Sequence, residues 1–87
     1  MSELRFIVRY DRGSDVLYIS ARQEAAAKGV EDRRGIVWRY DKDGNLIGVT
    51  IMDFGELWTG KHDELAGELS RRFHVPASDV EDALESA

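Results

Sequence analysis

The stretch that decides the fold reads Ile36-Val37-Trp38-Arg39-Tyr40-Asp41-Lys42-Asp43-Gly44-Asn45-Leu46-Ile47-Gly48-Val49-Thr50-Ile51-Met52. Apolar side chains alternate along both of its halves, which is the period of a half-buried strand. Residues 41–45 between the halves have the composition of a hairpin loop with glycine at the left-handed position. The stretch therefore predicts a β-hairpin with strands at 36–40 and 46–52. The residues expected to share a face are Ile36, Trp38 and Tyr40 on one strand, and Ile47, Val49 and Ile51 on the other.

A second hairpin is expected nearer the N-terminus. Its first strand shows alternation at Leu4, Phe6, Val8 and Tyr10, a Gly- and Asp-containing turn follows at 11–15, and its second strand covers 16–20. Residues 22–31 have helix propensity in an Ala-rich run but end like a strand, so periodicity leaves strand and helix both open. We expect a strand near 26–31.

The period becomes helical after residue 60. Leu65, Leu69 and Phe73 recur at intervals of four, with Thr59 as the expected N-cap. Pro76 interrupts the pattern, and Ser78-Asp79-Val80-Glu81 has the form of a capping box that opens a second helix.

These elements define an α+β fold: a meander-like antiparallel sheet of four or five strands, with a C-terminal helix pair packed on one face. The 87 residues suit a single domain, in which 1–58 form a strand-rich core and 61–87 a helical tail. A chain this short without cysteine must depend on its apolar core, on self-association, or on both.

Charge is concentrated in the tail. Residues 1–60 carry 9 Lys/Arg and 10 Asp/Glu, whereas residues 61–87 carry 3 and 7, and the net charge is −5. An acidic tail repels phosphate backbones and favours a basic protein partner, or it serves solubility alone. The sequence shows neither a signal-peptide h-region nor a membrane-spanning run, so we expect a cytoplasmic protein that binds no nucleic acid and no membrane.

Four aspartates at expected strand ends are the candidate site residues: Asp11, Asp15, Asp41 and Asp53. If the hairpins lie side by side, some of them could converge to do acid–base work or to bind magnesium. Acids at strand ends are more often turn caps, and Asp41-Lys42-Asp43-Gly44-Asn45 lacks the later glutamate of a calcium loop. We therefore expect no catalytic, metal or cofactor residues, and no cofactor.

The tail also has the packing pattern of a helix-turn-helix. A DNA-reading second helix should present basic or amide side chains to the major groove. The second helix expected here instead carries Asp79, Glu81, Asp82 and Glu85 and no basic residue. A plain helical pair is the better interpretation, and a DNA-binding regulator remains an alternative.

Leftover apolar residues point to self-association. Ile7 and Val37 fall on the faces opposite their strands' main apolar sets, and one helical layer cannot cover both faces of a small sheet. Large exposed apolar patches are unusual on monomers, so we expect a homo-oligomer, most simply a dimer.

The strand region resembles the domain of unknown function 2283 family. The resemblance covers about residues 4–54 and rests on Tyr10-Asp11, Asp15-Val16-Leu17-Tyr18-Ile19, the Asp41-Lys42-Asp43-Gly44 turn and Leu46-Ile47-Gly48-Val49. Thr50 departs from the family, which often has Glu there. The resemblance implies a small prokaryotic protein with a strand near 26–31 and no established activity; some relatives look like the antidote halves of toxin–antitoxin pairs.

The sequence thus favours an uncharacterised domain acting as a non-enzymatic protein-interaction module, with an antitoxin-like role as one form of it. An enzyme built on the four aspartates is the rival.

Overall fold

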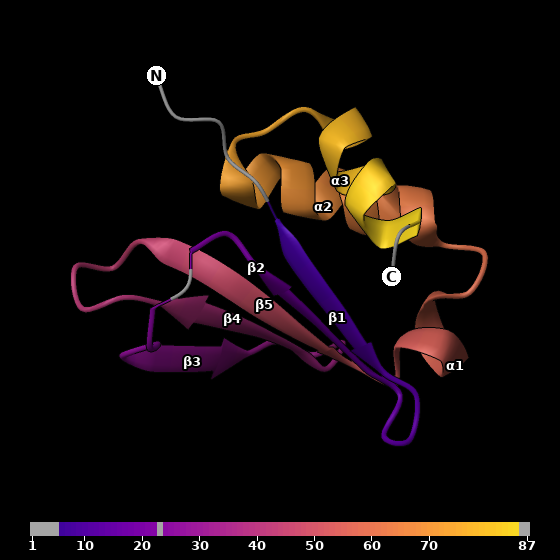
Figure 1. Cartoon of the computed structure of the whole chain (residues 1–87), viewed down its shortest axis with the longest axis horizontal. Helices are drawn as coiled ribbons and strands as arrows, with labels where there is room; N and C mark the ends of the chain where they lie inside the picture. Colours follow the sequence, from indigo (N-terminus) through magenta and orange to yellow (C-terminus); the bar gives the residue numbers. More distant parts are fainter. Residues whose placement is uncertain (1–5, 23, 86–87) are drawn as a thin grey trace.

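The computed structural model describes residues 6–22 and 24–85 and shows a single sheet with helices beside it (Figure 1). The strands are β1 (Ile7–Asp11), β2 (Val16–Ser20), β3 (Lys28–Glu31), β4 (Ile36–Tyr40) and β5 (Leu46–Met52). The helices are α1 (Phe54–Trp58), α2 (His62–Phe73) and α3 (Ala77–Glu85). The predicted α+β class and antiparallel sheet with C-terminal helices are confirmed. Leu4, expected in the first strand, lies outside the described residues.

The sheet order is β1-β2-β5-β4-β3, with every neighbouring pair antiparallel. Strands β3, β4 and β5 form a meander, and the β1–β2 hairpin joins it by pairing β2 with β5. Strand β5 is therefore the central strand, pairing with β4 of its own hairpin on one side and with β2 of the other hairpin on the other side. The two edge strands are β1 and β3.

A bulge in β5 changes which of its residues meet the core. Tyr40 pairs with Leu46 and Arg39 pairs with Gly48, so Ile47 is the inserted residue. Leu46 packs against the core cluster beneath the helices, whereas Ile47 is buried outside that cluster. The prediction that Ile47 shares a face with Val49 and Ile51 is wrong, because an inserted residue breaks the two-residue period.

The segment with ambiguous periodicity forms the short edge strand β3. Its register with β4 places Val30 beside Trp38, and the Ala27 N–H donates to the Tyr40 carbonyl at 2.9 Å. The expected strand near 26–31 is thus confirmed over four residues. Pairing with β4 outweighs the helix propensity of the alanines, as tertiary context commonly does.

Two helix starts differ from expectation. The short helix α1 precedes the predicted one, so Thr59 is its C-cap, with a hydroxyl that donates to the Gly55 carbonyl at 2.5 Å. Helix α2 instead begins after Lys61 without a side-chain cap. Helix α3 begins at Ala77, which places Ser78 inside its first turn and rules out the predicted capping box.

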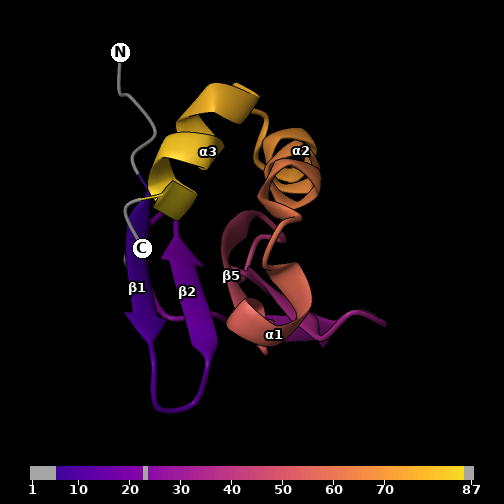
Figure 2. The same cartoon turned by 90° about the vertical axis from the view of Figure 1, so that its right-hand side faces the viewer.

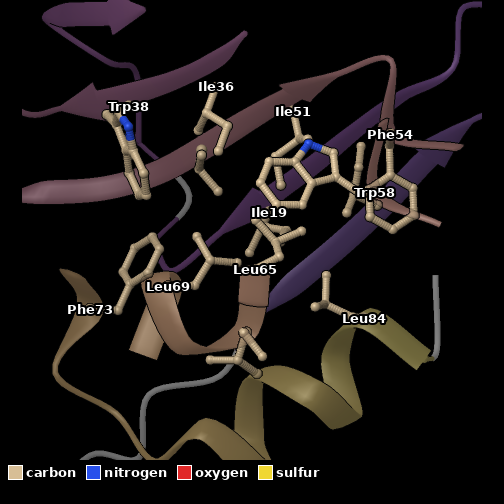
Figure 3. Packing of buried hydrophobic residues seen from close by; sticks show 14 residues of the cluster. Ile19, Ile36, Trp38, Ile51, Phe54, Trp58, Leu65, Leu69, Phe73 and Leu84 are labelled. Carbon is tan, nitrogen blue, oxygen red and sulfur yellow. The ribbon is translucent and has the colours of Figure 1, made fainter. Parts of the chain in front are cut away.

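The core lies between one sheet face and the helices (Figure 3). Figure 2 shows α3 above the β1–β2 hairpin and α2 above β5. Sheet residues such as Ile51 and Trp38 meet Leu65 and Leu69 of α2 and Leu84 of α3. Since both the strand-rich part and the tail supply fully buried side chains, they share one core.

Candidate functional site

The four candidate aspartates occupy two opposite ends of the sheet. Asp11, Asp15 and Asp53 lie at the end where β1 and β5 finish and β2 begins. Asp41 follows β4 at the other end, beside the start of β5. The structure therefore brings together three of the four and excludes Asp41 from any site that they share.

Of these three aspartates, Asp15 accepts the most hydrogen bonds. Its carboxylate accepts the Tyr10 hydroxyl at 2.6 Å and the backbone N–H groups of Gly55 and Glu56 at 2.7 and 3.1 Å. The Tyr10 hydroxyl, followed by the Gly55 N–H, lowers the pKa of Asp15, and the same contact raises the pKa of Tyr10. Asp15 thus caps the N-terminus of α1 from the β1–β2 turn, forty residues away in sequence.

The other two acids at this end have local roles. Asp11 accepts the Gly13 N–H at 3.0 Å, which is an Asx-turn within the hairpin loop. Asp53 is exposed and adopts a left-handed backbone, φ 53°, immediately before α1, without a side-chain cap bond. Within the described residues, no hydrogen bond or ion pair joins either carboxylate to a base, a nucleophile or a second acid.

Asp41 organises the β4–β5 loop. It is 7% exposed and accepts the backbone N–H groups of Asp43 and Asn45 at 2.9 and 2.8 Å. Its second oxygen accepts the Asn45 amide at 3.2 Å and the Arg22 guanidinium at 2.6 Å. The Asn45 backbone N–H, with the Asn45 side chain, Asp43 and Arg22, lowers the pKa of Asp41 to about 2.

Asp41→Asn is expected to lower stability at neutral pH and to make the remaining stability less sensitive to acid. The folded pKa of about 2 lies below the ordinary 3.8, so the ionised form is favoured by folding. This stabilisation is fully present above about pH 4 and is lost as pH falls toward 2. Urea midpoints measured from pH 7 to pH 2 should therefore converge for wild type and variant at the acid end.

The matched control is Asp43→Asn, because Asp43 lies in the same loop and gives Asp41 only its backbone N–H. Its pH profile should follow the wild type. Parallel profiles for wild type and Asp41→Asn over the whole range would contradict the assigned role of Asp41.

Asp32 was not among the predicted site residues, but its carboxylate accepts more hydrogen bonds than that of Asp11 or Asp53. It accepts the N–H groups of Arg34 and Ile36 at 2.8 and 3.2 Å and the Trp38 indole N–H at 3.2 Å. Burial alone would raise the pKa of Asp32, but these donors lower it on balance. The signal was available as Asp32-Arg33-Arg34-Gly35, an Asp three residues before a glycine at positive φ.

Arg34 extends this turn to the helices. Its guanidinium binds Asp32 at 3.0 Å and Glu68 of α2 at 2.5 Å, and Glu68 raises the pKa of Arg34. Arg72, one turn after Glu68, lies 4.5 Å over the ring of Trp38. These contacts fasten α2 over the β3–β4 half of the sheet, which is a structural role.

A groove of about 630 Å³ lies between the β4–β5 loop and the C-terminal end of α2. Arg22, Arg72 and His74 are among its lining residues. Arg22 is bound by Asp41, and Arg72 covers Trp38, so both arginines already serve the fold. Within residues 6–22 and 24–85, no group of three or more His, Cys, Asp or Glu could hold a metal ion.

The sheet face opposite α2 and α3 is the other candidate surface, called here the open face. Strand alternation and the pairing register place eleven side chains on it. They are Ile7, Arg9, Asp11, Val16, Tyr18, Ser20, Glu31, Val37, Arg39, Thr50 and Met52. Ile7 is 48% exposed and Met52 43% exposed, the highest values for large apolar side chains of the described sheet.

Arginines lie flat on the open face. The Arg9 guanidinium sits 4.4 Å over the Tyr18 ring. Arg39 donates to the Ile19 carbonyl at 3.2 Å and the Ser20 hydroxyl at 3.3 Å, passing so close over Gly48 that a Cβ there would meet it at 2.5 Å. A surface of tyrosine, methionine, aliphatic and arginine side chains has the composition enriched in protein interfaces.

Fold and surfaces together define a small α+β domain in which Asp11, Asp15 and Asp41 serve turns and a helix cap. The family model described as "Protein of unknown function (DUF2283)" matches residues 7–54, and the chain belongs to this family. The match covers the five strands and reaches the start of α1, as the resemblance in the sequence implied. No curated protein and no solved structure matches the chain. Among the described helices, none has the length and apolar character needed to cross a bilayer.

Proposed function

We propose that this protein is a non-enzymatic protein-interaction module that self-associates through its open face. The observation that carries the proposal is the pair of half-exposed apolar side chains, Ile7 and Met52, on a face that also presents Tyr18, Val37 and two arginines. Apolar surface gathered on one face of a small domain is typical of an association surface. A sheet that is covered by helices on one face only can bury its other face when a second molecule packs against it.

The acid–base rival is supported less well. Its four carboxylates are divided between two ends of the sheet, and Asp15 and Asp41 are each engaged by three or more donors. A DNA-binding role through α3 is disfavoured by charge, because the exposed residues of α3 include four carboxylates and no basic side chain.

Met52→Glu is expected to convert a dimer to a monomer. Met52 lies on the central strand and is 43% exposed, so a carboxylate is tolerated by the free chain but would be desolvated in the interface. Sedimentation equilibrium over a concentration series measures the change, and circular dichroism checks that the variant is folded.

The matched control is Leu57→Glu, because Leu57 is 48% exposed but lies on α1. It should remain dimeric. A monomeric wild type, or a dimer that Leu57→Glu disrupts and Met52→Glu does not, would refute association through the open face.

We propose a basic protein as the hetero-partner, as an antitoxin-like role would require, with α3 as the docking element. Asp79, Glu81, Asp82 and Glu85 are all exposed on this one helix. Opposite charge steers such an encounter and makes it salt-sensitive. Because the chain has no cysteine, it is also compatible with a reducing compartment, and we propose the cytoplasm.

Coexpression with the product of an adjacent small basic reading frame tests this. A complex with wild type that is lost when the four α3 acids are replaced by their amides supports it. A complex that is unchanged by those replacements refutes docking on α3.

A further inference from the structure

We propose that two copies of the chain pack open face to open face around a two-fold axis parallel to β5, so that Arg9 of each copy pairs with the partner's Glu31. This inference rests on the proposed function, because it uses the same face, and it goes further by fixing the register of the contact.

The pairing register places five residues in one row across the open face, with a basic residue at one end of the row and an acidic residue at the other. Arg9 pairs with Tyr18, Tyr18 with Thr50, Thr50 with Val37, and Val37 with Glu31. The row therefore carries a cation on edge strand β1 and an anion on edge strand β3. Its middle residue, Thr50, lies on the central strand β5.

A two-fold axis along β5 makes this row complementary to itself. Rotation about that axis exchanges β1 with β3 and β2 with β4, and it keeps each row at its own height along the strands. Arg9 then lies over the partner's Glu31, and Tyr18 lies over the partner's Val37. Thr50, on the axis, lies over the partner's Thr50. The same symmetry repeats the Arg–Glu pair at the opposite edge, as an isologous interface requires.

The neighbouring row fits the same axis. Met52 pairs with Val16 on β2, and its N–H donates to the Gly35 carbonyl at 3.2 Å. Because Met52 lies on β5, the axis places it against the partner's Met52. The half-exposed methionine would thus be covered at the centre of the interface, where hot-spot residues concentrate.

The side chains are long enough for the proposed pairing. Sheets that pack face to face lie about 10 Å apart. Arg9 and Glu31 are both exposed, and together their side chains are long enough to span this gap. The contact of Arg9 with the Tyr18 ring already holds the guanidinium over the face, which lowers the cost of ordering it.

The alternative two-fold axis, perpendicular to the strands, is electrostatically worse. It places β1 over the partner's β1 and brings Arg9 toward the partner's Arg9 when the rows coincide. Like charges facing each other across an interface disfavour that register. Opposite charge therefore selects the axis along β5.

Charge exchange tests the register. Arg9→Glu and Glu31→Arg should each weaken the dimer roughly tenfold or more, because each creates two like-charge contacts by symmetry. The double variant Arg9→Glu/Glu31→Arg should restore the dissociation constant to near the wild-type value. Arg12→Glu and Glu24→Arg are the matched controls, since both residues are exposed but belong to connecting segments. Both variants should leave the dissociation constant of the dimer unchanged.

The results of these experiments distinguish the proposed pairing register from association through the open face itself. If Met52→Glu dissociates the dimer but the double variant is as weak as the single ones, the register is wrong and the proposed function stands. If Arg9→Gln tightens the dimer, like charges face each other as the perpendicular axis requires, and this proposal is overturned. A monomeric wild type overturns both.

Cross-linking gives a second measurement. The chain has no cysteine, so Thr50→Cys introduces a single thiol on the proposed axis. A short bis-maleimide should join two copies through it, whereas Thr59→Cys, at the exposed end of α1, should give no covalent dimer. Efficient cross-linking through position 59 and none through position 50 would overturn the proposal.

Discussion

A chain that ends after Gly60 is expected to be unfolded, although it contains the whole segment that defines the family. The missing helices supply core residues that are 0–8% exposed: Leu65, Ala66, Leu69, Phe73, Val80 and Leu84. Burial of these side chains contributes on the order of 10 kcal/mol at 1.5–3 kcal/mol for each large one. That is comparable to the entire stability of a small domain, about 5–15 kcal/mol.

Circular dichroism and a urea titration of the 1–60 chain would measure this, with a chain ending at Glu85 as the control. The control retains all of α3 and should unfold cooperatively near the wild-type midpoint. A cooperative transition in the 1–60 chain would contradict the single shared core.

Trp38→Ala is expected to cost about 3–5 kcal/mol of unfolding free energy, the range for removing a large buried aromatic side chain. Trp38 is 2% exposed and lies in the core beside Phe73 and Leu69 (Figure 3). It also holds two contacts outside the core, since its indole N–H donates to Asp32 and Arg72 covers its ring. The substitution therefore opens a cavity and loosens the turn and α2 together.

Trp38→Phe separates these contributions. It retains most of the apolar volume but loses the bond to Asp32, so it should cost much less than the alanine variant. Guanidinium titrations of the three proteins measure the difference. Equal losses in both variants would show that the Asp32 bond, rather than the packing, carries the stabilisation.

The sequence predicted the β4–β5 hairpin with its observed bounds because two signals agreed there. The alternation of apolar side chains on both strands matched a loop with Gly44 at positive φ, 85°. The β3 strand was expected although periodicity left strand and helix both open, because Ala25, Ala26 and Ala27 favour a helix locally. The family resemblance supported the strand. Ile47 was misplaced because a bulge leaves no mark on a two-residue period.

Helix α1 could not be predicted, because the side chain that caps its N-terminus lies far away in the sequence. Residues 54–58 are too few to form a helix on propensity, and the carboxylate that caps them belongs to Asp15. For the same reason, the sequence identified Asp15 and Asp41 as strand-end acids but could not show that they serve opposite ends of the sheet. Which acids meet depends on long-range pairing between β2 and β5.

The position of β5 at the centre of the sheet also sets an order of assembly. The β1–β2 and β4–β5 hairpins each close over a few residues and can form within microseconds. Joining them requires Ser20 to find Gly48, which closes a much longer loop at a higher entropic cost. We expect this docking of two preformed ribbons to be the slow step. Substitutions in the preformed β1–β2 turn should then change the folding rate with little effect on the unfolding rate, whereas those along the β2–β5 seam should divide their effect between the two rates.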